Sequence, residues 1–356
     1  MTTNINKINF KGQVLYIGLD IHKKSWTVSI FSDTLFLKTY TQDADAGILI
    51  NYLMNHYPGA RYKCVYEAGY FGFWIQHRLQ SAGLECIVVH PADIPSTDKQ
   101  KHNKRDSSDS RKLGQNLRAG TMGGIFIPTL EQQQDRSLVR RRAQTVQSQS
   151  RIKNRIKSFL SFYGIHISEK EAGKYWSRRY IDYLRKIELY NESGQEAFNS
   201  LLRELDFYRE KTLELTRTIR ALSRTGLYNY KVNLLVSIPG ISMISAMTIL
   251  TELMDIRRFH SQERLRSYIG LIPSERSSGE KERKTGMTTR GNRDIKRIIV
   301  ESAWIAAAKD PALTMYFEEL CKRMKKMRAI IRIARKLSNR IMHVLLNEEE
   351  YKLQLS

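Results

Sequence analysis

The chain has 356 residues, and 59 lysines and arginines against 36 acidic residues give it a formal net charge of +23. This length suits two or three domains, and 41% of hydrophobic residues exclude a disordered polycation. The lack of a long apolar run or signal-peptide core and the count of three cysteines disfavour a membrane protein, a secreted disulfide scaffold and a zinc finger. The positive charge indicates a polyanionic partner, most simply nucleic acid. The few, scattered cysteines indicate a protein of the reducing cytoplasm.

Residues 1–122 have the pattern of an α/β domain. In chain order the residue spacing predicts strands at 14–20, 26–31 and 34–40, a helix from Asp45, a strand at 62–67, a helix at 71–81, a strand at 85–89 and a helix that begins near Asp106. Three consecutive antiparallel strands followed by strand–helix–strand units predict a mixed sheet flanked by helices.

Residues 123–228 are polar, rich in arginine and helical in their spacing. The stretch 136–157 carries eight lysines and arginines and no acid, and an interruption at 164–173 separates it from a second helical stretch with a near-heptad pattern. We expect an antiparallel helical hairpin or coiled coil that projects from the protein or forms a dimer. An ordinary layer of two packed helices is almost as good an interpretation.

Residues 229–356 are expected to form a mainly helical domain. The apolar segment 234–251 surrounds the turn Ile238-Pro-Gly-Ile241 and predicts a helix-hairpin-helix-like unit, although Pro-Gly is also simply a good turn. Helices are predicted at 259–269 and 293–308, with a loop at 273–292 between them. The stretch 322–340 carries nine lysines and arginines and no acid, which is typical of a basic amphipathic helix that contacts a phosphate backbone.

Four carboxylates stand at positions that favour chemistry. Asp20 ends the first strand on the face of Gly18, and Glu67 ends the fourth strand. Asp106 and Asp109 lie three residues apart at the start of a helix, so they point to one side. If the first and fourth strands are neighbours, the four acids converge, and two Mg²⁺ ions would offset their repulsion and hold the oxygens of a phosphodiester.

Each acid also has a structural interpretation. Asp106 and Asp109 could oppose the helix dipole, and Glu67 could pair with a lysine, whereas Asp20 is harder to explain at the end of an apolar strand. Six lysines and arginines between residues 99 and 112, Lys104 and Arg105 among them, surround the aspartates. They suit a metal site that admits a polyanion, and equally a solvated helix start.

A second group of functional residues lies in the predicted loop 273–292. Ser277 and Ser278 precede a glycine there, so a hydroxyl would be accessible to attack a phosphate, although Ser-Ser-Gly is most often only a loop. No histidine is close enough in sequence to act as a local base. The cations that would screen a phosphate are Arg276, Lys281, Arg283, Lys284 and Arg290.

In this order, these blocks resemble the DEDD insertion-sequence transposases, the IS one-ten family, with the related Piv invertases. The matching segments are Tyr-Ile-Gly-Leu-Asp-Ile-His-Lys at 16–23, Tyr-Glu-Ala-Gly-Tyr at 66–70, the block 104–113, Ser-Ile-Pro-Gly-Ile at 237–241, Gly-Leu-Ile-Pro with Ser-Gly in 270–279, and Thr-Arg-Gly-Asn at 289–292. Arg105 departs from the threonine common in the family and leaves the carboxylates intact.

The resemblance implies a RuvC-like, RNase H-type N-terminal domain and a C-terminal transposase domain. It implies that Asp20, Glu67, Asp106 and Asp109 form the metal-binding D-E-D-D tetrad, and that Ser278 is the nucleophile, with Ser277 as the fallback. It further implies Mg²⁺ as cofactor, a structured guide RNA from the ends of the element, association with the bacterial nucleoid, and a homodimer or tetramer whose active site combines the acids of one subunit with the serine of another.

The predicted function is therefore that of a transposase or site-specific recombinase that cleaves and rejoins DNA. One alternative is a RuvC-type structure-specific endonuclease, in which the acids activate water and Ser278 has no chemical role. Another is a non-catalytic scaffold that only binds nucleic acid. Residue chemistry alone ranks nuclease and recombinase about level, and the resemblance favours the recombinase.

Overall fold

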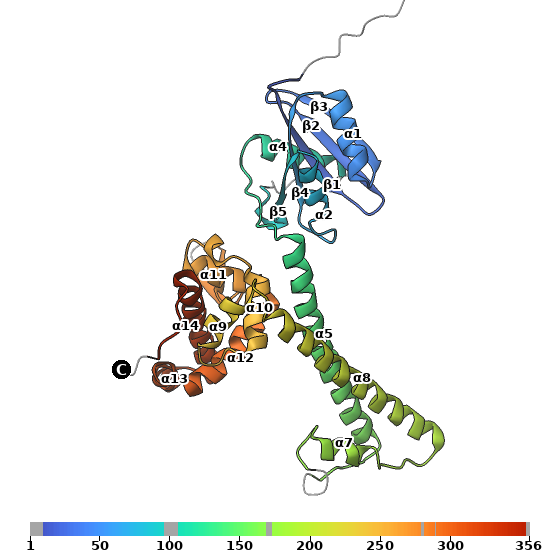
Figure 1. The fold of residues 1–356 in the computed structure, drawn as a ribbon, viewed down its shortest axis with the longest axis vertical. Helices are drawn as coiled ribbons and strands as arrows, with labels where there is room; N and C mark the ends of the chain where they lie inside the picture. Colours follow the sequence, from blue (N-terminus) through green and yellow to red (C-terminus); the bar gives the residue numbers. More distant parts are fainter. Residues whose placement is uncertain (1–9, 96–105, 169–172, 279–280, 289, 354–356) are drawn as a thin grey trace, which may run out of the picture. The chain divides into compact units, whose positions relative to one another are not determined.

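The structure is a computed structural model that describes residues 10–95, 106–168, 173–278, 281–288 and 290–353, with backbone only for 106, 107, 274–278 and 281–286. The chain divides into two compact units, Met1–Ile127 and Pro128–Ser356. The first is built around a sheet and the second is mostly helical (Figure 1). Within the described ranges, no helix is long and apolar enough to cross a membrane.

The first unit contains the predicted mixed sheet. Its elements are β1 (Val14–Ile21), β2 (Ser25–Phe31), β3 (Phe36–Asp43), α1 (Ala46–His56), β4 (Arg61–Glu67), α2 (Trp74–Ser81), β5 (Glu85–Val89), the short helix η1 (Pro91–Asp93) and α4 (Asp106–Arg118). The five strands follow the order β3-β2-β1-β4-β5. β1 pairs with β2 antiparallel and with β4 parallel, so the expected neighbourhood of the first and fourth strands is confirmed.

Alternation along β1 divides its side chains between two layers. Leu15, Ile17 and Leu19 are fully buried in a core that also contains residues of α1 and α2, such as Leu49 and Leu79. A smaller cluster on β4, β5 and α4 contains Val65, Val89 and Leu113. Because strand residues alternate between faces, α1 and α2 cover one face of the sheet and α4 covers the other.

The second unit begins with a long helical hairpin. Its elements are α5 (Leu130–Phe162), α7 (Arg178–Leu184), α8 (Glu192–Leu222), α9 (Asn229–Val236), α10 (Met243–Leu253), the short helix η2 (Ile256–Arg258), α11 (Gln262–Ile269), β6 (Pro273–Ser278), β7 (Lys281–Met287), α12 (Arg293–Lys309), α13 (Pro311–Arg323) and α14 (Lys326–Asn347). Thr129 starts α5 with a capping box, in which its side chain and that of Gln132 bond each other's backbone N–H groups.

Helices α5 and α8 pack side by side and run antiparallel. Arg142 donates to Thr216, and further along the pair Phe159 stacks on Phe198 at 5.4 Å between ring centroids. The far half of this hairpin has a core of its own, which includes residues of α7. The two helices therefore form a hairpin with an independent distal core, and its self-association remains a prediction.

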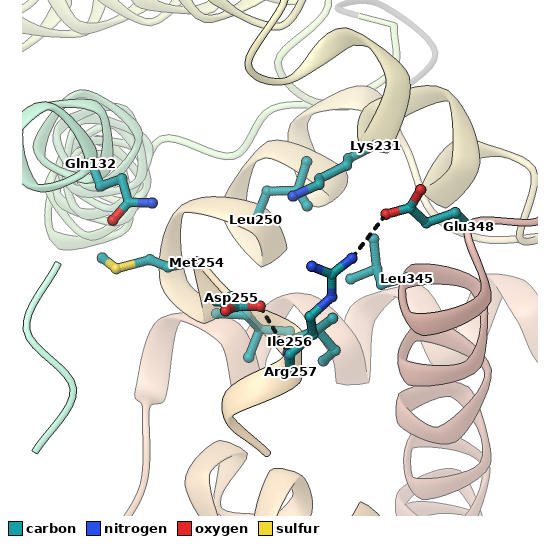
Figure 2. A pocket seen from close by; sticks show the side chains of 10 residues that line it. Gln132, Lys231, Leu250, Met254, Asp255, Ile256, Arg257, Leu345 and Glu348 are labelled. Carbon is teal, nitrogen blue, oxygen red and sulfur yellow. Dashed lines mark hydrogen bonds and ion pairs between the residues drawn. The ribbon is translucent and has the colours of Figure 1, made fainter. Parts of the chain in front are cut away.

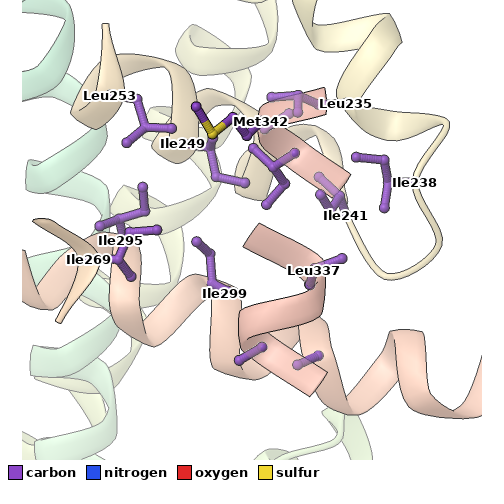
Figure 3. Packing of buried hydrophobic residues seen from close by; sticks show 14 of the residues in the cluster. Leu235, Ile238, Ile241, Ile249, Leu253, Ile269, Ile295, Ile299, Leu337 and Met342 are labelled. Carbon is purple, nitrogen blue, oxygen red and sulfur yellow. The ribbon is translucent and has the colours of Figure 1, made fainter. Parts of the chain in front are cut away.

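The remaining helices surround the largest hydrophobic core among the described residues. Figure 3 shows Leu235, Ile249, Ile299 and Leu337 of four different helices packed together, and all four are buried. The turn between α9 and α10 belongs to this core, because a Cβ atom on Gly240 would lie 2.4 Å from the carbonyl oxygen of Ser302 in α12. Helices α9 and α10 lie on either side of the turn as expected, while its contact with phosphate remains a prediction.

Two sequence-based expectations differ from the structure. The segment 273–292, expected to be a loop, contains the antiparallel hairpin β6–β7. The basic segment 322–340 is not one helix, because α13 ends at Arg323 and α14 begins at Lys326 and continues to Asn347. The hairpin was missed because backbone pairing needs no apolar alternation, and this segment is polar on both faces.

Candidate active site

Asp20 and Glu67 lie at the same edge of the sheet. The last pair in the parallel register of β1 and β4 is Leu19 with Tyr66, so the next residues on the two strands are Asp20 and Glu67. The Asp20 side chain is 20% exposed and lies within 3.3 Å of His22 Nε2. Glu67 is exposed and pairs through its backbone position with Val89 of β5. The predicted proximity of the two strand ends is therefore present.

Both acids occupy positions on the face of the sheet that α4 covers. Asp20 is two residues from Gly18, and Glu67 is two residues from Val65, which belongs to the cluster with Leu113 of α4. Since strand residues repeat a face every two positions, Asp20 and Glu67 share the α4 side. Leu19, which lies between Gly18 and Asp20 in β1, is buried in the core on the other face of the sheet.

Because Gly18 is a glycine and has no Cβ atom, α4 can approach the sheet closely at this position. A Cβ atom on Gly18 would lie 2.0 Å from the carbonyl oxygen of Ser110 and 2.4 Å from the backbone nitrogen of Gly114, and both atoms belong to α4. The fully buried Ser110 hydroxyl is 2.9 Å from the hydroxyl of Ser29 on β2, which fixes the helix along the strand direction. Backbone contact and a buried hydrogen bond together set the position of α4.

The same contacts give α4 its direction. Ser110 bonds Ser29, which pairs with Gly18, whereas Arg118 lies over the ring of Phe31, which pairs with Tyr16. The helix therefore runs opposite to β1, and its N-terminal end is nearest the strand end that carries Asp20.

The two aspartates of α4 fall at this N-terminal end. Asp106 is its first residue and lies one turn before Ser110, and Asp109 lies one turn before the buried Leu113, so both positions are on the sheet side of the helix. Asp109 is half-buried, whereas the side chain of Asp106 lies outside the description. Among the described side chains, no three His, Cys, Asp or Glu residues form a group that could hold a metal ion.

The predicted nucleophile Ser278 is the last residue of β6. Its backbone partner in the hairpin is Lys281, and Arg276 pairs with Arg283, while Ser277 pairs with Glu282. Because cross-strand partners share a face and neighbours alternate, positions 276, 278, 281 and 283 fall on one face and positions 275, 277, 282 and 284 on the other. The face of Ser278 thus has three basic positions and no acidic one among these residues.

The structure describes the side chains of only some of the lysines and arginines that were predicted to contact nucleic acid. Arg290 is exposed just after the hairpin, and Lys104 and Arg105 lie outside the described residues. Only backbone positions are described for Arg276, Lys281, Arg283 and Lys284.

The second unit also has a pocket of about 340 Å³ between the start of α5, α9, the end of α10 and the end of α14 (Figure 2). Across it, Arg257 and Glu348 form an ion pair at 3.3 Å. It is lined by none of the residues that the sequence singled out. It therefore gives no support to the predicted chemistry.

Two models of one family match most of this architecture. Residues 17–165 match the DEDD transposase model of the IS110 type, and residues 232–318 match the model described as the transposase IS116/IS110/IS902 family. Together they cover well over half of the chain. The chain belongs to the IS110 family of transposases.

Named relatives of this IS110-family transposase agree with the assignment. The protein y4qE of Sinorhizobium fredii, named as a transposase, is 30% identical over 68% of this chain, and the match spans 58% of its own length. A second S. fredii protein named as a transposase, y4rJ, is 25% identical over 91% of this chain and 89% of its own. The transposase for the insertion sequence element IS1533 of Leptospira borgpetersenii is 25% identical, over 82% of this chain and 84% of its own.

Membership identifies the protein as a transposase enzyme that acts on DNA, and its DEDD domain implies dependence on a divalent cation. The residue types present fit such a cation, because carboxylates are hard ligands and the positions of Asp20, Glu67, Asp106 and Asp109 fall at the ends of β1 and β4 and at the start of α4. Sequence reasoning missed His22 as a neighbour of Asp20, although their spacing of two residues was visible.

Proposed function

We propose that this transposase cleaves and rejoins DNA strands with the hydroxyl of Ser278 as nucleophile and with Asp20, Glu67, Asp106 and Asp109 holding two Mg²⁺ ions. The observation that carries the proposal is the convergence of β1, β4 and the first turn of α4 at one edge of the sheet. When bound there, Mg²⁺ would polarise the scissile phosphate and balance charge on the attacking and leaving oxygens.

The chemistry is a pair of transesterifications. The bond between Ser278 Oγ and phosphorus forms as the bond from phosphorus to one sugar oxygen breaks, which leaves a phosphoserine link and a free strand end. A strand end of the partner duplex then attacks the phosphoserine and releases the serine. Because each step exchanges one phosphodiester for another, the reaction needs no ATP.

The register of the hairpin supports Ser278 rather than Ser277 as the nucleophile. Ser278 shares its face with the basic positions Arg276, Lys281 and Arg283, which would attract a phosphate and stabilise the charge that develops during attack. The face of Ser277 has acidic positions at Glu275 and Glu282, and one basic position at Lys284, which therefore falls on the face away from Ser278. An acid beside the nucleophile would repel the phosphate that the nucleophile must reach.

The partners that we propose follow the resemblance and the charge of the chain. They are DNA at the ends and target of the element, a structured guide RNA, and further copies of the protein in a dimer or tetramer in the bacterial cytoplasm. In this assembly the region 1–122 would act as the catalytic domain, 123–228 as the arm that joins subunits, and 229–356 as the domain that presents the serine.

The test is trapping of covalent protein–DNA adducts with Ser278→Ala and Ser277→Ala as matched variants. We expect the adduct and strand exchange to be lost in Ser278→Ala and retained in Ser277→Ala, with DNA binding unchanged in both. A wild-type protein that cuts DNA in Mg²⁺ without forming an adduct would support the RuvC-type endonuclease instead. Retained cleavage in Asp20→Ala would contradict the role of the tetrad.

A further inference from the structure

A buried acid outside every sequence motif connects three elements of the second unit. Glu252 in α10 is 1% exposed, and both of its carboxylate oxygens accept hydrogen bonds from Arg140 of α5, at 2.6 Å from Nε and 2.8 Å from Nη2. Asn292 Nδ2 donates to the same carboxylate at 2.6 Å. The backbone oxygen of Glu252 accepts from the hydroxyl of Tyr268 at 2.9 Å. Both oxygens of the buried carboxylate thus accept hydrogen bonds from neighbouring side chains.

Asn292 joins this group to the end of the serine hairpin. It follows β7 by five residues and is the N-cap of α12, where its Oδ1 accepts from the backbone nitrogens of Asp294 and Ile295. Its own backbone nitrogen donates to the carbonyl of Tyr268 at 2.8 Å. One side chain therefore fixes the start of α12 and, through Glu252, connects it to α5.

The base of the hairpin is packed too tightly to shift freely. Thr288 N donates to Ile272 O at 3.1 Å and closes the two strands. Three residues after Thr288, Gly291 has a φ of +124° and lies against Gly270. A Cβ atom on Gly291 would be 2.6 Å from the Gly270 Cα. Arg335 of α14 donates to the carbonyl of Leu271 at 2.6 Å. The direction of the hairpin is therefore set at its base, where the Glu252 group is attached.

A small error at the base would matter at the tip. Ser278 lies five residues from Pro273, so it stands about 17 Å from the base at roughly 3.4 Å per residue. A tilt of about 4° would move a point at that distance by about 1 Å, and a misplacement of this size can cost about 10²-fold in rate.

We propose that Glu252, Arg140 and Asn292 are positioning residues that anchor the serine hairpin to α5 and so set where Ser278 meets the phosphate. A buried ion pair adds little net stability compared with apolar residues of the same size, so a role in fixing one geometry explains this group better than stability does. The inference rests on the proposed function of Ser278.

The experiment compares Glu252→Gln and Asn292→Ser with the control Asp310→Asn in the full chain. Serine keeps the cap of α12 but is too short to reach Glu252. Asp310 is also 1% exposed, accepts from Arg340 at 2.5 Å and caps α13, so its variant removes an equivalent buried pair elsewhere. The substrate is a DNA duplex in which the two ends of the element are joined. It is supplied together with the RNA transcribed from the element's non-coding stretch.

We expect all three variants to lower the unfolding temperature, while only Glu252→Gln and Asn292→Ser speed hydrogen exchange at the Thr288 and Asn292 amides. In these two, single-turnover adduct formation from bound DNA should fall by roughly 10- to 100-fold. A wild-type adduct rate in Glu252→Gln, or an equal loss in Asp310→Asn, would overturn the proposal. If the wild-type protein forms no adduct, the proposed function is wrong. Unchanged hydrogen exchange in Glu252→Gln would then show that Glu252 does not anchor the hairpin either.

Discussion

At the scale of single residues, Gly18 decides how close α4 can come to the sheet. The atoms that a Cβ at this position would meet are the Ser110 oxygen and the Gly114 nitrogen, which are backbone atoms and cannot rotate away. Gly114 has an equivalent role, because a Cβ there would lie 2.7 Å from the ring of Phe31. The two glycines together hold the N-terminal end of α4, with Asp106 and Asp109, beside the end of β1.

Gly18→Ala is therefore expected to destabilise the protein by about 1–3 kcal/mol through overpacking, although alanine is otherwise the better residue in a strand. The same change should reduce the Mg²⁺-dependent cleavage of DNA, because α4 and its aspartates move away from Asp20. Thermal unfolding and cleavage assays would measure both effects. Gly123→Ala is the control, since nothing lies within 4 Å of its added Cβ and stability should not fall. Equal unfolding temperatures for the two variants would contradict the close contact.

The sequence could predict Asp20 and Glu67 as neighbours, because both end apolar strands and strands of a βαβ arrangement end at one edge. It could not predict the closeness of α4, which depends on two glycines 96 positions apart meeting in space. Glu252 was equally hidden. An acid inside an apolar run indicates a buried partner, but the partners Arg140 and Asn292 are known only once the fold is known.

At the scale of elements, the sequence predicted most helices and strands, but its pattern did not single out α7 or α13 and led to wrong expectations at two further places. The hairpin β6–β7 has charged residues at successive positions, so it lacks the alternation that marks a half-buried strand. The break before α14 lies in a uniformly basic stretch, where no glycine or proline marks the end of α13. Where a segment is polar at nearly every position, its residue pattern contains no periodic signal, and backbone pairing or capping decides the structure.

The distal half of the α5–α8 hairpin should behave as a separate packing unit. Phe198 is fully buried there against Phe159, so Phe198→Ala should destabilise this half by about 3–5 kcal/mol. Hydrogen exchange should then increase in α7 and the first half of α8 and remain slow in α12. Phe162→Ala, at a side chain that is 81% exposed, is the matched control and should leave exchange unchanged.

If this hairpin joins subunits through its tip, Phe162→Ala will weaken self-association without loss of stability.

At the scale of the whole molecule, the charge of +23 dominates the encounter with nucleic acid. Phosphate contacts release counterions, so the logarithm of the binding constant falls linearly with the logarithm of salt concentration, by about 0.9 for each phosphate neutralised on duplex DNA. We expect the exposed side of α14 to be one source of such contacts. Arg328 and Arg332 are exposed on this side and Lys326 is exposed at the start of the helix, while the opposite side, with Ile333 and Leu337, is buried.

Replacing Lys326, Arg328 and Arg332 together with glutamine should therefore lower the slope of this salt dependence by about 3, if all three contact phosphates. Binding of a short duplex of arbitrary sequence at several salt concentrations measures the slope. The control removes the same charge at Arg203, Arg257 and Arg323, which already pair with Glu196, Glu348 and Glu319. Those pairs leave little charge for DNA, so the slope should change less. Equal slopes for the two triple variants would mean that the net charge of the chain, rather than the face of α14, sets the affinity, and that the basic helix has no specific role in holding the DNA.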